Sequence, residues 1–195
     1  MKSDPLKNHR ILVIDDNRAI HDDFRKILIT SSSLANNLDE DEAALFGDRT
    51  VKFQLPVFEI DSAYQGQEGL DLIEKSLLED RPYALAFVDV RMPPGLDGVE
   101  TTRRIWEKNP DLQVVICTAY SDYSWEEMLK TLGYSDRMVI LKKPFDNIEV
   151  LLLAIAMTEK WRLYQESKLR LEDLEKILEE RTLTLKGVLN RNEGY

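Results

Sequence analysis

Polar side chains with related chemistry follow four separate apolar runs of this sequence. The runs and the residues behind them are RILVI before Asp15 and Asp16, ALAFV before Asp89, LQVVIC before Thr118, and MVIL before Lys142 and Lys143. Three carboxylates brought to one place would repel each other unless a hard cation bound them, and magnesium prefers such oxygen ligands. A carboxylate can also attack phosphorus, while a hydroxyl and an ammonium hold the phosphoryl oxygens. The set therefore predicts chemistry on a phosphoryl group.

Each of these residues taken alone has a simpler interpretation. An aspartate after a strand often caps the next turn or helix, and a lysine before a proline is usually only part of a turn. Asp89 alone is explained equally well as a turn residue. A site is favoured because matching residues end the other apolar runs as well, in the order that this chemistry needs.

The elements that would position these residues alternate along the chain. Apolar runs predict five strands, at 10–14, 57–60, 84–88, 112–117 and 138–141. Helical spacing predicts helices after Asn17, at 67–78, 99–107 and 124–132, and from 147 onward. This alternation predicts a parallel sheet with helices on both faces, so that the polar residues lie along one edge. A doubly wound arrangement is the natural candidate, although the pattern alone leaves the strand order open.

Composition restricts the class of protein. The chain has 195 residues, 43% hydrophobic and 32% charged, which fits one ordinary domain with a charged extension. Its net charge of -10 argues against a general nucleic-acid or anionic-membrane binder. The single cysteine, Cys117, excludes an internal disulfide framework, and no apolar segment reaches the roughly 18 residues of a membrane span. The N-terminal MKSDPLKNHR is not a signal peptide, so a cytoplasmic protein is expected.

Four motifs together resemble the receiver domain of response regulators in two-component signalling. They are ILVIDD at 11–16, DVRMPPGLDG at 89–98, CTA at 117–119 and KKPF at 142–145. The resemblance covers about residues 9–157, after an N-terminal tail of residues 1–8. It implies a bacterial protein with a flavodoxin-like α/β fold and a parallel sheet in the order 2-1-3-4-5. It also implies a regulatory phosphoacceptor rather than an enzyme, served by a histidine kinase or a phosphotransfer protein.

The resemblance assigns roles around the phosphoryl group. It implies that Asp89 is the phosphoacceptor. Thr118 would bind the phosphoryl group and report its presence, and Lys143 would pair with it. Lys142 is the weaker candidate for this pairing, because neighbouring residues of a strand point in opposite directions.

The same resemblance implies a Mg²⁺ site, in which Mn²⁺ is an alternative ion. Asp89 and Asp16 would ligate the ion directly, and Asp15 would do so directly or through water. The backbone carbonyl of Arg91 would complete the protein ligands.

Three features depart from the family pattern. The loop MPPGLDG is one residue longer than the commonest form, a change that should not harm the chemistry. Residues 31–56 are an insertion after the first helix, predicted to be a surface loop with one short helix. Ile140 stands where many receivers carry an aromatic residue, so a switch could run through the Thr118 loop and Tyr120 instead.

The C-terminal part predicts one long helix, from Asn147 to about Asn190, or roughly 65 Å at 1.5 Å per residue. A seven-residue repeat is formed by Tyr164, Leu171, Leu178 and Leu185, joined by Leu174 and Val188 and interrupted by Ser167 and Arg181. This repeat predicts an imperfect parallel coiled coil over 158–195, and hence a homodimer. The alternatives are a helix folded back on its own domain and a long single helix.

The segment ILEERTLTL at 177–185 resembles the signalling helix that joins receiver or sensor modules to catalytic domains. The expected function is a receiver that passes its phosphorylation state through a dimeric coil to an output domain beyond this sequence. In relatives with this layout the output is often a diguanylate cyclase, a phosphodiesterase or a histidine kinase.

Two other classes of function use the same features. A haloacid-dehalogenase-type phosphatase also has an aspartate nucleophile, but places it after the first strand, usually as DxD. This chain instead has the adjacent pair Asp15 and Asp16 there. A phosphorylation-independent scaffold that dimerises through the coil is the second class, and the complete acidic set argues against it.

Overall fold

The computed structural model describes residues 8–29, 55–119 and 125–192, with side chains up to residue 184 except that of Trp125. Most of the insertion predicted at 31–56 lies outside these residues, as does Tyr120. The side chains of Leu185 and Val188, which belong to the predicted seven-residue repeat, also lie outside them.

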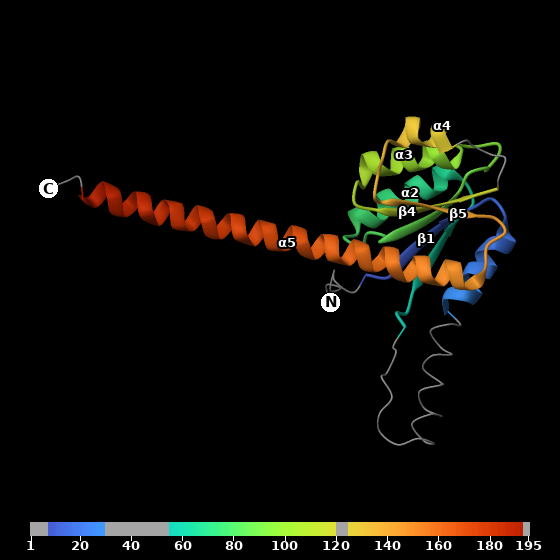
Figure 1. Cartoon of the computed structure of the whole chain (residues 1–195), viewed down its shortest axis with the longest axis horizontal. Coiled ribbons are helices and arrows are strands. Elements are labelled where there is room, and N and C mark those ends of the chain that lie inside the picture. Colours follow the sequence, from blue (N-terminus) through green and yellow to red (C-terminus); the bar gives the residue numbers. More distant parts are fainter. Residues whose placement is uncertain (1–7, 30–54, 120–124, 193–195) are drawn as a thin grey trace, which may run out of the picture.

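Five parallel strands form a single sheet in the order β2-β1-β3-β4-β5 (Figure 1). They are β1 (Arg10–Ile14), β2 (Glu59–Ala63), β3 (Leu85–Asp89), β4 (Gln113–Thr118) and β5 (Met138–Lys142). The parallel α/β fold and the strand order implied by the family resemblance are both confirmed. All five carboxyl ends therefore lie on one edge of the sheet.

The second strand begins later than its hydrophobicity predicts. A strand starting at Val57 was expected, but Val57 is 72% exposed and the pairing with β1 runs from Glu59 to Ala63. β2 is an edge strand with the polar sequence EIDSA, and only its last residue, Ala63, is buried. Backbone pairing with β1, rather than an apolar run, determines where β2 lies.

Helices cover both faces of the sheet. They are a helix over residues 18–29, α2 (Gly66–Leu78), α3 (Gly98–Lys108), α4 (Trp125–Leu132) and α5 (Asn147–Asn192). Because successive strand residues point to opposite faces, Leu12 and Ile14 lie in a core with α2 and α3. Ile11 and Val13 lie in the other core, with the helix of residues 18–29 and α5. The sheet is therefore buried on both sides.

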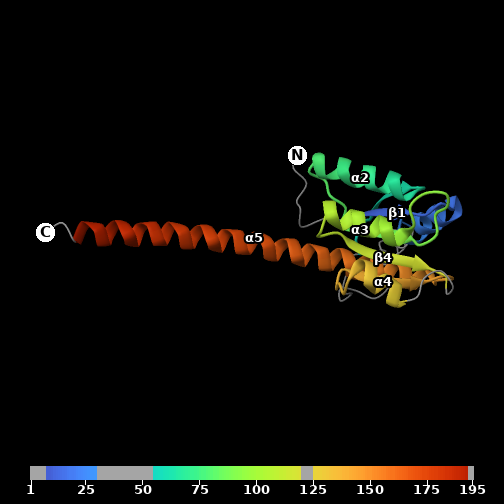
Figure 2. The same cartoon turned by 90° about the horizontal axis from the view of Figure 1, so that it is seen from above.

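Helix α5 is 46 residues long, about 69 Å at 1.5 Å per residue. Its first turns pack on the sheet through Val150 and Ala154, and Trp161 is the last residue of this buried face, with 3% exposed. The later turns of α5 project away from the domain (Figures 1 and 2). The alternative of a helix folded back on its own domain is therefore wrong. None of the described helices is long and apolar enough to cross a membrane.

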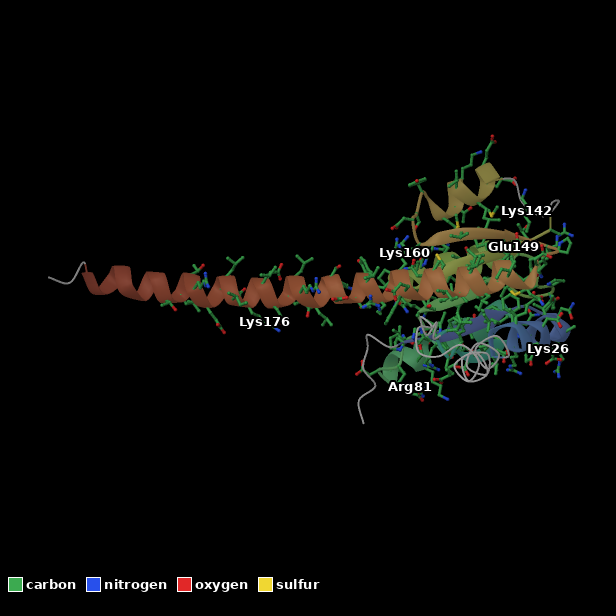
Figure 3. All side chains as sticks on the ribbon, turned by 60° about the horizontal axis from the view of Figure 1, so that its bottom comes forward. Lys26, Arg81, Lys142, Glu149, Lys160 and Lys176 are labelled. Atoms are coloured by element: carbon green, nitrogen blue, oxygen red, sulfur yellow. The ribbon has the colours of Figure 1, made fainter. Side chains whose placement is uncertain are left out.

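Polar contacts fix α5 where it leaves the domain. Asp111, in the loop before β4, accepts hydrogen bonds from Gln165 at 3.1 Å and Lys168 at 2.8 Å. Lys160 pairs with Asp136, before β5, at 3.0 Å. Figure 3 shows Lys160 at this exit.

Candidate functional site

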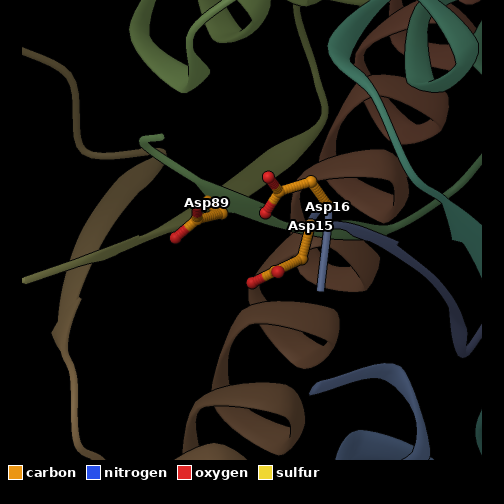
Figure 4. A group of neighbouring side chains, drawn as sticks. All are labelled: Asp15, Asp16 and Asp89. Atoms are coloured by element: carbon orange, nitrogen blue, oxygen red, sulfur yellow. The ribbon is translucent and has the colours of Figure 1, made fainter. Parts of the chain in front are cut away.

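Three carboxylates lie together at the carboxyl edge of the sheet (Figure 4). Asp15 and Asp16 directly follow β1, and Asp89 is the last residue of β3. One carboxylate oxygen of each lies within 4.8 Å of the others. They meet because β1 and β3 are parallel neighbours that pair Ile14 with Val88. The structure thus brings together the three aspartates that the sequence placed at strand ends.

A glycine lets helix α3 approach the backbone of Asp89. The N–H of Gly98 donates to the carbonyl of Val90 at 2.9 Å. A β-carbon at position 98 would lie 2.1 Å from the carbonyl oxygen of Asp89, so a larger residue would displace the backbone of Asp89 and Val90. Asp97 begins α3 by accepting a hydrogen bond from the N–H of Glu100 at 2.8 Å.

Asp15 is buried, and its backbone and carboxylate are both held. Its N–H donates to the carbonyl of Ala63 at 3.1 Å, and its carbonyl accepts from Nε2 of His21 at 2.7 Å. Its Oδ1 accepts from the N–H of Asn17 at 2.8 Å, and its Oδ2 accepts from Nζ of Lys143 at 2.8 Å. The position of Asp15 is therefore determined by contacts from three segments of the chain.

Lys143 lies between the two buried carboxylates. Its Nζ is 2.8 Å from Asp15 Oδ2 and 2.7 Å from Asp89 Oδ1. The preceding residue, Lys142, is exposed and pairs with Thr118 in the ladder between β5 and β4. Lys143 rather than Lys142 therefore reaches the carboxylates.

The remaining predicted site residues lie at the same edge. Asp16 is exposed, and the N–H of Arg91 donates to Asp89 Oδ2 at 3.1 Å. Thr118 is the last residue of β4 and is buried, and its hydroxyl donates to the carbonyl of Ala119 at 2.9 Å. A metal-ligating role for the Arg91 carbonyl and a phosphoryl-binding role for Thr118 stay predictions.

The electrostatics of the edge are dominated by the buried carboxylates. Burial raises the pKa of Asp89, Lys143 opposes that rise through its hydrogen bond and charge, and the charge of Asp15 adds to it. Burial disfavours the charged form of Lys143, but its hydrogen bonds to the two carboxylates outweigh this and raise its pKa. Among the described contacts of this edge, the single Lys143 ammonium faces two buried carboxylates with Asp16 nearby, so carboxylates outnumber ammonium groups there.

Substituting Asp89 with asparagine is expected to raise the unfolding temperature at neutral pH. Because the pKa of Asp89 is raised in the fold, the folded protein binds this proton more tightly than the unfolded chain does. Stability contributed by Asp89 is therefore greatest at low pH and is lost as pH rises through the raised pKa. Thermal unfolding without divalent cations should show a gain at neutral pH that shrinks toward acid pH.

Asp136→Asn is the matched control for this prediction. A hydrogen bond from Lys160 lowers the pKa of Asp136, so this carboxylate contributes stability above its ordinary pKa. The control should lose a little stability at neutral pH. An Asp89→Asn protein that melts at or below the parent temperature under the same conditions would contradict the electrostatic account.

The donor set of this edge fits a hard divalent cation. Its ligands are carboxylate oxygens close enough to share one ion. Mg²⁺ favours oxygen ligands and keeps several waters, so three carboxylates suffice for a site that also takes phosphate oxygens. The excess negative charge around Asp89 favours the same kind of ion.

Sequence reasoning did not identify His21 as part of this site. It lies on a helix among apolar residues such as Ile20 and Phe24, where a histidine has no distinguishing spacing. Its contact is with a backbone carbonyl, and no side-chain pattern marks such an acceptor. Only the path of the chain after β1 brings the ring back to Asp15.

Comparison with known families identifies the domain. The model of the response regulator receiver domain matches residues 38–156, which is more than half of the chain. β1 and the Asp15–Asp16 pair precede the matched residues, but β1 pairs with both β2 and β3 and so belongs to the same sheet. The insertion after the first helix separates them from the rest in sequence.

Individual relatives agree with this result. Response regulator MprA of Mycobacterium avium (strain 104) is 30% identical over 142 residues, covering 73% of this chain and 47% of that relative. The match thus spans about half the length of the relative. Two solved structures share the fold. A CheY-like receiver domain protein of Methanospirillum hungatei JF-1 matches with a TM-score of 0.54 and 22% identity, over 80% of this chain and 97% of that chain. A protein named adenylate cyclase of Rhodopirellula baltica matches with a TM-score of 0.60 and 22% identity, over 85% of this chain and 98% of that chain. With a family match over most of its sheet, this chain belongs to the response regulator receiver domain family.

Proposed function

We propose that this chain is a phosphorylation-controlled receiver module, which accepts a phosphoryl group on Asp89 from a histidine kinase or a phosphotransfer protein. The observation that carries the proposal is the setting of the Asp89 carboxylate. It lies at the end of β3, with Lys143 Nζ on one oxygen at 2.7 Å and the Arg91 N–H on the other at 3.1 Å. Asp15 and Asp16 complete the acidic edge beside it.

The proposed reaction moves a phosphoryl group between two nucleophiles. An oxygen of Asp89 would form a bond to phosphorus as the bond from phosphorus to the donor atom breaks, and the electron pair leaves with the donor. Asp15, Asp16, Asp89 and the Arg91 carbonyl would hold Mg²⁺, or Mn²⁺ in its place. When bound, such an ion supplies positive charge that offsets the negative charge of the phosphoryl oxygens.

Lys143 and Thr118 would hold the transferred group. The Lys143 ammonium already lies on the carboxylate that would be phosphorylated, so a phosphoryl oxygen can take over its hydrogen bond. Thr118 directly follows Cys117, the residue of β4 that pairs with Asp89, so it stands next to the end of β3. It would have to turn from the carbonyl of Ala119 to reach the phosphoryl group. This reorientation is the proposed report of phosphorylation.

The projecting part of α5 would transmit the signal as one half of a parallel homodimeric coiled coil. Tyr164, Leu171 and Leu178 recur every seven residues there and are 48%, 60% and 64% exposed. A second copy is the simplest partner for such an apolar stripe. In a parallel pair in register, Arg170 would face the partner's Glu175, which adds charge complementarity to that arrangement.

The output of this relay would be a further domain. The receiver itself is regulatory, and the coil would connect it to an effector such as a diguanylate cyclase, a phosphodiesterase or a histidine kinase. One structural relative carries the name adenylate cyclase, and this proposal extends an enzymatic output to the present chain by analogy. Localisation in the bacterial cytoplasm is part of the same proposal.

Phosphoryl transfer tests the proposal directly. The parent protein, incubated with acetyl phosphate and Mg²⁺, is expected to gain the mass of one phosphoryl group by intact mass spectrometry. Asp89→Asn should gain none, because the amide is not a nucleophile toward phosphorus. Asp71→Asn, at an exposed position of α2, is the control and should react as the parent does.

Two outcomes would count against the proposal. A parent that gains no phosphoryl mass from acetyl phosphate or from a panel of histidine kinases is not a phosphoacceptor. Equal mass gain in Asp89→Asn places the acceptor elsewhere. If beryllofluoride also leaves dimerisation and coil geometry unchanged, the scaffold becomes the better account.

A further inference from the structure

His21 is a buried side chain that hydrogen-bonds to the backbone of the acidic edge, the edge formed by Asp15, Asp16 and Asp89. It is 1% exposed, and its Nε2 lies 2.7 Å from the carbonyl oxygen of Asp15. Because a carbonyl can only accept, Nε2 must carry the hydrogen, and the ring is a donor to this backbone. Among the described residues, Nδ1 of the same ring is buried without a hydrogen-bond partner.

Aromatic contacts fix the orientation of this imidazole. The ring of Tyr64 lies 4.7 Å from that of His21, at an interplanar angle of 57°. Arg18 is on the same helix as His21, and its guanidinium lies 4.9 Å from the centre of the Tyr64 ring. The backbone N–H of Tyr64 is in turn held by Glu68 at 2.6 Å. Tyr64 and Gln65 form the loop between β2 and α2, called the β2–α2 loop. This loop supplies no carboxylate to the site, but through Tyr64 it contacts the imidazole that holds Asp15.

The same loop also reaches the other acidic segment. Gln65 is adjacent to Tyr64, and its side-chain amide lies 3.4 Å from the carbonyl of Pro93 in the loop after Asp89. A β-carbon on Gly95 would come within 2.3 Å of the Gln65 side-chain oxygen, so this loop and Gln65 are closely packed. The β2–α2 loop therefore braces both loops that bear the carboxylates.

We propose that His21 is a positioning residue for the cation site, acting through the peptide that joins Asp15 to Asp16. The carbonyl that accepts from His21 belongs to this peptide. Its hydrogen bond therefore orients the plane of the peptide group, and with it the backbone of Asp16. Asp16 is exposed, whereas Asp15 is held by its own contacts. Loss of the donor would leave a buried carbonyl unpaired and let the peptide turn, which displaces the Asp16 carboxylate.

This inference rests on the proposed function, because it assumes that the carboxylates bind a divalent cation. The test uses the full chain and Mn²⁺, with free ion measured by electron paramagnetic resonance and Mg²⁺ by competition. His21→Leu removes the donor. It is expected to weaken the binding of both ions by about 10-fold or more, the usual effect of losing a residue that hydrogen-bonds to a metal ligand. His21→Gln can place an amide N–H near the position of Nε2 and should stay within about threefold of the parent.

Leu28→Ala separates positioning from helix packing. Leu28 is fully buried on the same helix as His21, so its truncation lowers stability without touching the acidic edge. Its ion affinity should match that of the parent, although its unfolding temperature falls. If His21→Leu does not fold, His21→Asn takes its place: its shorter amide cannot reach the Asp15 carbonyl, so it should bind more weakly than His21→Gln.

The outcomes distinguish this inference from the proposed function. Weak binding in His21→Leu or His21→Asn with rescue in His21→Gln supports positioning. Parent-like affinity in every His21 variant that folds, at whatever stability, overturns it and leaves the phosphoacceptor proposal intact. A parent protein that binds neither ion overturns both.

Discussion

Replacing Lys143 with methionine is expected to destabilise the metal-free protein by about 3 kcal/mol, or roughly 10 °C in unfolding temperature for a chain of this size. The Lys143 side chain is 24% exposed, while those of Asp15 and Asp89 are only 3% and 10% exposed. Methionine has a similar length and apolar stem, so the change removes the charge more than the volume. It leaves two buried carboxylates facing each other without a cation.

The loss should depend on pH in a defined direction. Without Lys143, burial and the charge of Asp15 raise the pKa of Asp89 with less opposition. A raised carboxyl pKa gives stability that is fullest at low pH and is lost as pH rises. The gap between Lys143→Met and the parent is therefore expected to narrow toward acid pH. Thermal or urea unfolding across a pH series measures it.

Divalent cations should restore part of the stability. A cation that binds only the folded state stabilises it by mass action, and the variant offers it carboxylates without a competing ammonium. The rise in unfolding temperature on adding Mg²⁺ should therefore be larger for Lys143→Met than for the parent. Phosphoryl transfer from acetyl phosphate should nevertheless be slower, because the ammonium that would hold the phosphoryl oxygens is gone.

Lys142→Met is the matched control, since it removes the same charge from the exposed neighbouring position. It should leave the unfolding temperature and the Mg²⁺ response within experimental scatter of the parent. Equal losses in the two variants would mean that net charge, rather than the bridge at Lys143, accounts for the effect.

The sequence predicted the acidic edge because its signal is local. Asp15, Asp89 and Thr118 each stand where an apolar run ends, and parallel strands bring such ends to one edge. The strand order, in contrast, came from the family resemblance. It depends on pairings between residues far apart in sequence, such as Leu12 with Ala86, and no local pattern encodes them.

The support of the site was not predictable in the same way. The contact of His21 with the Asp15 carbonyl joins a side chain to a backbone atom, so neither residue type indicates it. The role of the β2–α2 loop through Tyr64 and Gln65 depends on packing between loops. Such contacts are set by tertiary structure, and a pattern of strands and helices leaves them undetermined.

The seven-residue repeat of α5 illustrates the same limit. Val150 and Met157 have the same spacing as Tyr164, Leu171 and Leu178, so the repeat alone does not show where the helix leaves the receiver, and the boundary after residue 157 was predicted from the family resemblance. In the structure Val150 and Met157 are buried at 0% and 5% exposure, whereas Tyr164 is 48% exposed. One stripe therefore packs on the sheet up to Met157 and faces outward from Tyr164 onward.

The outward part of this stripe leads to the second large expected effect. The double variant Leu171→Glu with Leu178→Glu is expected to weaken self-association at least about 100-fold, because each layer of a parallel coil would bury two unpaired carboxylates. Sedimentation equilibrium or light scattering over a concentration series measures this. Leu169→Glu with Leu183→Glu adds the same charges to exposed leucines of the same helix, off the repeat, and should leave the proposed dimer unchanged.

Orientation can be tested on the same helix. Leu174 lies between Leu171 and Leu178 at the other core position of the repeat, so Leu174→Cys should form a disulfide across a parallel pair in register. Cys117 is buried, with 3% exposed, so the parent provides a background without cross-links. A parent that remains monomeric at high concentration, or a control that dissociates as readily as the seam variant, would reject the coil. A dimer that gives no disulfide at position 174 would support self-association but contradict the parallel register. It would then also contradict a coil with both receivers at the same end.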